Sequence, residues 1–366
     1  MTLTKIEDIV IYRDEAFYSS FPSVVCRPDG DLLLAFRRAP ERRMRPGGSV
    51  THSDPNSWIM QIRSDDNAVT WTRDPEPLFI HPRAGNQDPC LMQLDDGTLL
   101  CSTFSWELLC DADVLDDLPA ARRGPTGWWM TNLGACVVRS EDGGETWSGP
   151  HYVGALPGAA NRDIGITSRG ACRGRMAQRD DGTVLFAVYG AAEADLPRCA
   201  YLYASDDRGK SWEYVSQIAS DDTVSFNEPH LHITPSGTVV CLMRTADMDG
   251  YLAVTQSTDG GQTWEDWRPS GIWGHPFTTA PTPGGNVLVA WGHRRPEYGI
   301  RCKLVDAEFQ SLETSEEIVL RDDGDNGDIG YPWAVQMADG RMLVAYYFNH
   351  DDGTRYIAGT VVEIDE

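Results

Sequence analysis

The side chains best suited to chemistry occur at matching places in six successive segments of the sequence. Each stands nine positions before a turn glycine, or ten in the fifth segment, and in five of the six a proline follows. The six residues are Phe21, Asp88, Arg173, Glu228, His275 and Tyr331. A carboxylate, a phenol, an imidazole and a guanidinium can together supply a nucleophile, a base, an acid and charge neutralisation. Taken singly, each residue is equally well explained as an ordinary residue at the start of a strand.

The elements that carry these residues are expected to be β-hairpins. Each turn glycine closes a dipeptide such as Asp29-Gly30 or Asp339-Gly340, and an apolar run follows it. Short apolar runs between turn signals predict strands, and runs that are apolar on both faces fit strands buried between neighbouring sheets. Six such hairpins predict an all-β fold, a six-bladed β-propeller. The innermost strands would line a central channel, and their starts would share one mouth of it.

A second repeat supports this architecture. The pattern Ser-x-Asp-x-Gly-x-Thr/Ser-Trp occurs four times, and the first copy lacks the glycine. The copies span residues 64–71, 140–147, 205–212 and 257–264. Asp and Gly favour a tight turn, and the Trp can pack beneath it as an apolar plug. Four copies of one motif mark a repeat protein, and we expect a structural role for them.

Composition restricts the possible functions. The formal net charge of −24 argues against nucleic acid and anionic membranes as partners, and no run is long enough to span a membrane. The nine cysteines are scattered singly, which favours reduced thiols and a cytoplasmic protein, as does the lack of a signal-peptide pattern. Metal-type spacing is absent, so no metal or other cofactor is expected. One domain is predicted over residues 1–366, in which the strand-like residues 6–12 close the last blade beside residues 355–364.

The boxes and the six hairpins resemble the sialidase superfamily, and the resemblance covers nearly the whole chain. It implies a tyrosine nucleophile at Tyr331, with Glu228 as its base. Arg244, sixteen residues after Glu228, matches the second of three arginines that bind a substrate carboxylate. The loop of the first blade matches the family's general acid at Asp54, with His52 able to share or replace that role. A neutral tyrosine suits a sialic acid, because a carboxylate nucleophile would be repelled by the carboxylate on the anomeric carbon of that sugar.

The sequence departs from that family at the first arginine. Sialidases begin the first blade with Arg-Ile-Pro, whereas this chain has Ser20-Phe21-Pro22. The remaining side chains expected to bind substrate are Arg38, Asp88, Arg173, His275, Arg294 and Arg295. Among them, Arg294 or Arg295 could be the third arginine, and Arg38 or Arg173 could replace the first, as could Arg37. The expected activity is therefore a glycoside hydrolase that releases a terminal acidic sugar, either a uronic acid or a sialic or ulosonic acid.

Two other functions remain compatible with the sequence. A polysaccharide lyase would use His and Tyr to remove the proton beside a uronate carboxylate, and several histidines fall near the predicted mouth. They are His52, His230, His232, His275, His293 and His350. A carbohydrate-binding propeller without turnover would use tryptophans as stacking platforms. The candidates are Trp106, Trp128, Trp129, Trp273 and Trp333, although packing between blades explains most tryptophans as well.

Overall fold

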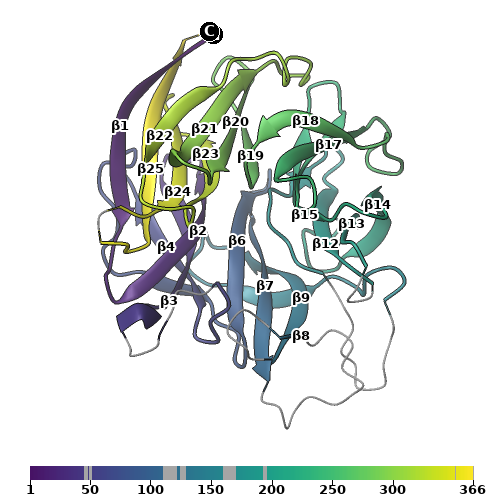
Figure 1. Cartoon of the computed structure of the whole chain (residues 1–366), viewed down its shortest axis with the longest axis horizontal. Helices are drawn as coiled ribbons and strands as arrows, with labels where there is room; N and C mark the ends of the chain where they lie inside the picture. Colours follow the sequence, from purple (N-terminus) through teal and green to yellow (C-terminus); the bar gives the residue numbers. More distant parts are fainter. Residues whose placement is uncertain are drawn as a thin grey trace.

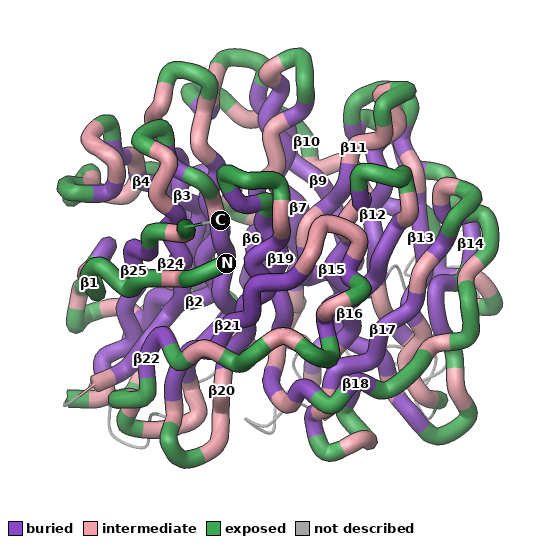
Figure 2. The backbone as a smooth tube through the Cα atoms, turned by 90° about the horizontal axis from the view of Figure 1, so that it is seen from above, coloured by how far each residue is buried: buried purple, intermediate pink, exposed green. Residues whose placement is uncertain are grey.

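The structure is a computed structural model that describes residues 1–44, 48, 52–109, 122–123, 129–159, 170–192, 196–350 and 352–365. Its strands form six antiparallel sheets. The sheets stand around a central axis, with buried backbone towards the centre and exposed turns at the periphery (Figure 2). The predicted six-bladed β-propeller is therefore confirmed.

The first three blades follow one another along the chain. Blade 1 contains β2 (Phe17–Cys26), β3 (Leu32–Pro40), β4 (Trp58–Ser64) and β5 (Glu76–Phe79), with the short 3-10 helix η1 (Arg42–Met44) after β3. Blade 2 contains β6 (Gly85–Gln93), β7 (Leu99–Leu109), β9 (Trp129–Ser140) and β10 (Ser148–Tyr152), and β8 (Arg122–Arg123) pairs with β9. Blade 3 contains β11 (Ala177–Gln178), β12 (Val184–Gly190), β13 (Cys199–Ser205) and β14 (Glu213–Ala219).

The last three blades complete the ring. Blade 4 contains β15 (Phe226–Ile233), β16 (Val239–Thr245), β17 (Tyr251–Ser257) and β18 (Arg268–Trp273). Blade 5 contains β19 (Phe277–Pro281), β20 (Val287–His293), β21 (Tyr298–Val305) and β22 (Ile318–Gly324). Blade 6 contains β23 (Gly330–Gln336), β24 (Met342–Phe348), β25 (Tyr356–Asp365) and β1 (Thr2–Tyr12).

Blade 6 joins the two ends of the chain. Strand β1 pairs antiparallel with β25, so that Thr2 lies opposite Asp365 and Tyr12 lies opposite Ile357. The two strands run side by side at one edge of the molecule (Figure 1). Because the first strand supplies the outer edge of the last blade, the ring is held closed by backbone hydrogen bonds.

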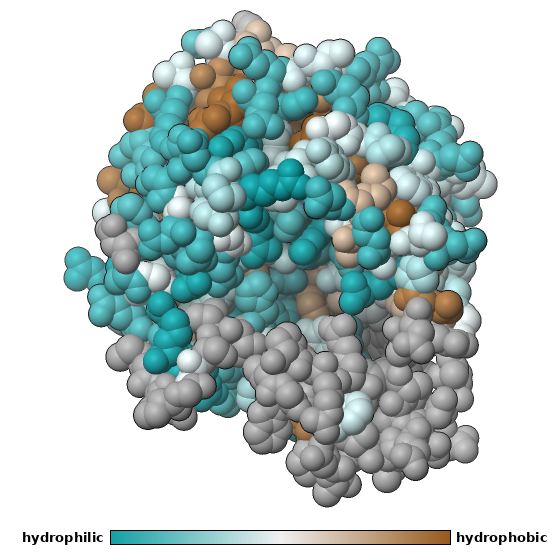
Figure 3. Space-filling view, viewed as in Figure 1, coloured by the Kyte–Doolittle hydropathy of each residue, from teal (hydrophilic) through white to brown (hydrophobic). Residues whose placement is uncertain are grey.

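The core lies between the blades. Strand β24 is buried at every position, because its two faces contact different neighbouring sheets. The eight cysteines within the described ranges are all free thiols, and most of them belong to this core; Cys110 lies outside the described residues. On the face seen in Figure 3, hydrophilic residues predominate and hydrophobic ones form small separate groups. Within the described residues, no helix is long and apolar enough to cross a membrane.

The second, third and fourth boxes are hydrogen-bonded to the preceding blade. In the second box, Asp142 accepts hydrogen bonds from the Ser140 hydroxyl at 2.7 Å and from the Thr146 backbone N–H at 2.9 Å. Trp147 is half-buried, and its indole N–H donates to Oε1 of Gln61 in blade 1 at 3.1 Å. All four boxes follow the third strand of a blade, at the end of the propeller opposite to the starts of the innermost strands.

Candidate active site

An unusual backbone conformation recurs at the start of four innermost strands. Phe21, Asp88, Glu228 and Tyr331 have φ values of 57°, 47°, 50° and 52°, in the left-handed region that non-glycine residues seldom adopt. Each precedes a proline, and each lies at a register shift between the first two strands of its blade. Such conformations cost about 1–3 kcal/mol each and concentrate at functional sites. The register shift changes the direction in which these side chains point. Three of them are close enough to interact electrostatically: Asp88, Glu228 and Tyr331.

Tyr331, Glu228 and Arg244 form one hydrogen-bonded group. The Tyr331 hydroxyl donates to Oε1 of Glu228. Nη1 of Arg244 lies 3.2 Å from both carboxylate oxygens of Glu228 and 3.5 Å from the Tyr331 hydroxyl. Burial and the nearby Glu228 carboxylate raise the pKa of Tyr331 well above its usual value. The phenol therefore carries its proton at neutral pH and needs a base in order to react as a nucleophile.

Phe21 occupies the place of the missing arginine. Its ring centroid lies 4.5 Å from that of Tyr331, 5.2 Å from that of Tyr347 and 5.1 Å from that of His52. The side chain is only 1% exposed. Aromatic packing therefore supports Tyr331 at the position where the resemblance implied an arginine.

Arg173 does not line an open part of the site. Its guanidinium donates to four main-chain carbonyls: those of Phe21, Pro22, Pro89 and Tyr331, at 3.0–3.4 Å. The side chain is 2% exposed. Arg173 was expected to bind substrate, but its donors hold together the starts of blades 1, 2 and 6. It is a positioning residue for the left-handed segments.

The other arginines proposed to replace the first one are also engaged. Arg37 is fully buried, and Asp54, Asp88 and Asp328 are its electrostatic neighbours. Nη2 of Arg38 lies 3.3 Å from Asp14, and its guanidinium stacks 3.5 Å above the ring of Phe17. The geometry of Arg38 therefore does not suit the predicted substrate contact.

The predicted general acid, Asp54, forms a bidentate ion pair with Arg42. Nε and Nη2 of Arg42 bind the two oxygens of Asp54 at 2.7 and 2.9 Å, and the Asn56 backbone N–H donates to Oδ1 at 2.9 Å. Burial would raise the pKa of Asp54, but the Arg42 and Asn56 contacts lower it below the usual value. Asp54 is thus ionised at neutral pH and has no proton to donate, which disagrees with the role implied by the resemblance.

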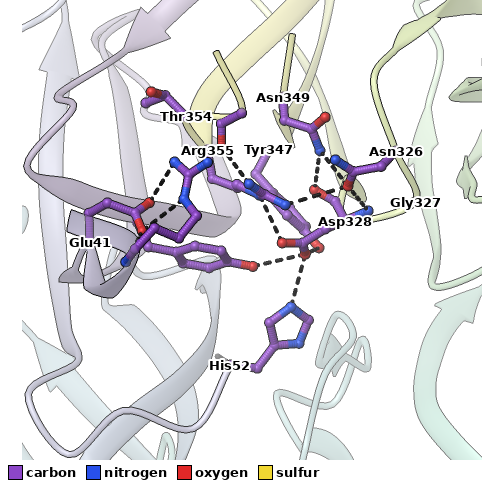
Figure 4. A network of polar contacts seen from close by, with 12 residues as sticks. Glu41, His52, Asn326, Gly327, Asp328, Tyr347, Asn349, Thr354 and Arg355 are labelled. Atoms are coloured by element: carbon purple, nitrogen blue, oxygen red, sulfur yellow. Dashed lines mark hydrogen bonds and ion pairs between the residues drawn. The ribbon is translucent and has the colours of Figure 1, made fainter. Parts of the chain in front are cut away.

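Asp328 is a central residue that the sequence did not single out. It accepts hydrogen bonds from Tyr18 at 2.9 Å, Tyr347 at 3.0 Å and Arg355 at 2.8 Å, and Nε2 of His52 lies 3.0 Å away (Figure 4). Burial opposes ionisation, but the contacts with His52 and Arg355 lower its pKa. His52 is therefore oriented by Asp328 beside the ring of Phe21. The one available signal was the position of Asp328, three residues before Tyr331.

Blade 5 contributes a guanidinium and an imidazole to the site. Arg294 lies 5.9 Å from the centroid of the Tyr331 ring and donates to the Tyr347 hydroxyl at 3.2 Å. Burial and the arginines nearby lower the pKa of His275 to about 2. Among the described residues, its Nδ1 has no hydrogen-bond partner. His275 is therefore a neutral imidazole near three arginines: Arg244, Arg294 and Arg295.

Arg295 lies farther out. It forms an ion pair with Asp249 at 2.8 Å and stacks 3.9 Å above the Trp273 ring. Arg295 thus covers one face of the half-buried Trp273, and Trp333 is only 1% exposed. Trp106 and Trp129 are half-buried, whereas Trp128 lies outside the described residues.

Asp88 differs from the other acidic residues of the site. It is 5% exposed, and its Oδ1 has no hydrogen-bond partner among the described residues. Burial, together with the nearby charge of Glu228, raises its pKa to about 7 in spite of Arg173 and Arg37. Tyr189, which the sequence did not single out, is an electrostatic neighbour of both Asp88 and Glu228.

A hollow of about 770 Å³ lies at the opposite end of the channel, lined by residues of the turns that follow the innermost strands. Its lining includes Arg175 and His232, and burial lowers the pKa of His232 to about 4. No group like Tyr331, Glu228 and Arg244 is found among its lining residues. Within the described residues, no cluster of three or more His, Cys, Asp or Glu side chains could hold a metal ion.

Comparison with known proteins identifies the family of this chain. The family of BNR repeat-like domains matches residues 120–344, and the chain belongs to this family. A crystal structure of a protein of unknown function from Dyadobacter fermentans is 39% identical, with a TM-score of 0.93 and 99% of each chain covered. A search of curated proteins gives no match.

Two more distant structures share the fold. A Hadza microbial sialidase is 20% identical, with a TM-score of 0.63 over 94% of this chain and 65% of that one. An α-L-arabinanase from Penicillium chrysogenum, solved with arabinobiose, is 14% identical, with a TM-score of 0.65 over 98% of each chain. At these identities the likeness establishes the propeller architecture.

Proposed function

We propose that this protein is a glycoside hydrolase that works at the channel mouth formed by the starts of the innermost strands. The observation that carries the proposal is the group of Tyr331, Glu228 and Arg244, in which a buried phenol donates to a carboxylate held by a guanidinium. The family's propeller fold is also that of a sialidase and an arabinanase, which supports a carbohydrate substrate.

In the first step, the Tyr331 oxygen attacks the anomeric carbon while Glu228 takes the phenolic proton. The bond from the anomeric carbon to the leaving oxygen breaks, and that oxygen receives a proton from an acid. In the second step, water attacks the anomeric carbon and gives a proton to the conjugate base of that acid, while Tyr331 leaves and recovers its proton from Glu228. Arg244 stabilises the carboxylate of Glu228 before the proton moves and lies close enough to stabilise the phenolate that leaves.

The substrate is a terminal acidic sugar whose carboxylate lies away from the anomeric carbon, as in a uronic acid. Phe21 stands where the first of the three arginines that bind a sialic acid carboxylate would be expected. The arginines that could have replaced it, Arg37, Arg38 and Arg173, contact other groups of the protein. Arg244 and Arg294 remain beside Tyr331 as cations for a carboxylate elsewhere on the sugar. In a chain with a net charge of −24, such local cations are needed to attract an acidic substrate.

The test is a turnover screen with uronate-containing oligosaccharides, sialosides and aryl glycosides, analysed by mass. We expect hydrolysis, seen as a gain of one water, with at least one uronide. Tyr331→Phe and Glu228→Gln should each lower turnover by several orders of magnitude while the unfolding transition stays cooperative. Full activity in both variants would contradict the proposal.

A polysaccharide lyase is the second candidate, and His275 is the observation that favours it. Its neutral imidazole has a free nitrogen next to Arg244 and Arg294, and it could remove a proton beside a carboxylate that these arginines neutralise. A lyase would give an unsaturated product that absorbs in the ultraviolet and has gained no water. In that case His275→Asn would abolish turnover, whereas a hydrolase would retain part of it.

A further inference from the structure

Asp88, Glu228 and Tyr331 hold equivalent places in alternate blades. They start the innermost strands of blades 2, 4 and 6, with the same left-handed backbone before a proline. In a six-membered ring, alternate blades are equally spaced around the axis, so Asp88 faces both members of the Tyr–Glu pair. The three side chains are buried to a similar degree, with 4–5% of each exposed. A sugar that reaches Tyr331 must also lie close to Asp88.

Arg173 fixes this arrangement through contacts with the main chain. It donates to the carbonyl of Pro89, next to Asp88, and to the carbonyl of Tyr331 itself. The same guanidinium therefore ties the two segments together and limits how far Asp88 can move away from Tyr331. Among the described residues, Oδ1 of Asp88 is a buried atom without a hydrogen-bond partner, so no contact within the protein engages this carboxyl oxygen.

We infer that Asp88, rather than Asp54, is the acid that protonates the leaving oxygen. This inference rests on the proposed hydrolase activity and names the residue that completes it. As the glycosidic bond breaks, its electron pair goes to the leaving oxygen, which takes the proton of Asp88 and departs as an alcohol. In the second step the carboxylate of Asp88 takes a proton from the attacking water, and the acid is restored. The net reaction consumes one water for each glycosidic bond.

The protonation states of the two candidates agree with this assignment. Burial, and the charge of Glu228, raise the pKa of Asp88 to about 7, so a large share of the molecules hold the proton at neutral pH. Asp54 is bound on both oxygens by Arg42, and its pKa is lowered. Two carboxyl groups with pKa values displaced in opposite directions are a common sign of which one acts as the acid.

The first experiment compares two aryl glycosides of the sugar identified in the turnover screen, one with a 2,4-dinitrophenyl and one with a 4-methoxyphenyl leaving group. The dinitrophenolate leaves without protonation, whereas the methoxyphenolate needs an acid. Asp88→Asn should lower turnover of the methoxyphenyl glycoside by about 10²–10⁴-fold and that of the dinitrophenyl glycoside far less. Asp54→Asn is the matched control and should leave the ratio between the two substrates unchanged.

The outcomes separate this inference from the proposed function. Equal loss on both substrates in Asp88→Asn, or a change of ratio in Asp54→Asn alone, would overturn the role of Asp88 while hydrolysis itself stands. Absence of any glycoside turnover by the wild-type protein would overturn both. A readout independent of activity is the carboxyl ¹³C resonance of labelled aspartate, which should show one group titrating near pH 7 that disappears in Asp88→Asn. Titration of Asp88 at the usual aspartate value would also overturn the inference.

Discussion

The hydroxyl of Tyr331 donates a hydrogen bond to Oε1 of Glu228, although the two residues lie 103 positions apart and begin strands in different blades. The contact is made by two left-handed residues that each precede a proline. A strained local conformation, repeated around the ring, thus brings a nucleophile and its base together. The following predictions concern the residues that hold this pair in place.

Replacing Phe21 by arginine should not restore a sialidase. The ring is 1% exposed and lies 5.9 Å from the guanidinium carbon of Arg37, so the new cation would be buried beside an existing one. We expect a loss of roughly 3–5 kcal/mol in unfolding free energy, measured by urea denaturation, and no cleavage of sialosides. Phe21→Leu is the control, with a smaller loss. Sialoside turnover at undiminished stability would show that the position is open to substrate.

Arg173→Lys should destabilise the protein and disturb the site together. A lysine cannot reproduce the planar set of donors that reaches four carbonyls. We expect a loss of roughly 3–5 kcal/mol in urea denaturation and lower turnover, because the carbonyl of Tyr331 loses its tether. Arg179→Lys alters an exposed ion pair with Asp181 and should change stability by less than about 1 kcal/mol. Similar small effects for both variants would argue against the positioning role of Arg173.

The boxes should contribute stability and not chemistry. Trp147 is half-buried and donates to Gln61 of the preceding blade, so Trp147→Ala should lower the unfolding free energy by about 3 kcal/mol. Trp147→Phe keeps much of the packing and should lose about 1 kcal/mol with the hydrogen bond. The turnover of the folded protein should be unchanged in both variants. A specific loss of turnover at full thermal stability would contradict a purely structural role.

The stability of the protein should depend on pH through Asp88 and Asp54 with opposite signs. Asp88 has a folded pKa of about 7 against the usual 3.8, so the folded state binds a proton that the unfolded chain releases between these values. Its contribution is fully present below pH 3.8 and is lost as the pH rises to 7. The stability of Asp88→Asn relative to wild type should therefore increase as the pH is raised from 5 to 8. The expected increase over this range is about 3 kcal/mol.

For Asp54 the sign is reversed. Its pKa is lowered in the folded state, so its contribution is present above the usual aspartate value and is lost as the pH falls. Asp54→Asn should accordingly be less stable than wild type at pH 8, with a smaller difference under acid conditions. Urea denaturation of both variants at several pH values checks this. Differences that do not vary with pH would show that neither carboxyl has a displaced pKa.

The sequence allowed the ring to be predicted because its signals are local. A turn glycine, an apolar run and a residue before proline are enough to place Asp88, Glu228 and Tyr331 at equivalent positions. The partners of those residues could not be predicted in the same way. Asp54 was matched by its place in a loop, but the ion pair with Arg42 depends on how that loop folds back.

The same limit explains the residues that were missed or misjudged. In the sequence, Arg173 has the position of a substrate-binding residue. Only the structure shows that its guanidinium donates to main-chain carbonyls of three blades. Asp328 follows no repeat signal, and its role comes from Tyr18, Tyr347 and Arg355, which approach it from distant parts of the chain. Such contacts are set by packing between blades and leave no pattern within a single segment.

The central claim is that Tyr331 becomes covalently attached to the sugar. The most direct measurement is trapping with an activated deoxyfluoro glycoside of the sugar found in the screen, followed by intact mass and peptide mapping. We predict a mass increase of one deoxyfluoro sugar, located on the peptide that contains Tyr331, and no label in Tyr331→Phe. A label on Glu228, Asp88 or another residue, or turnover that yields an unsaturated product without any trapped intermediate, would contradict the account.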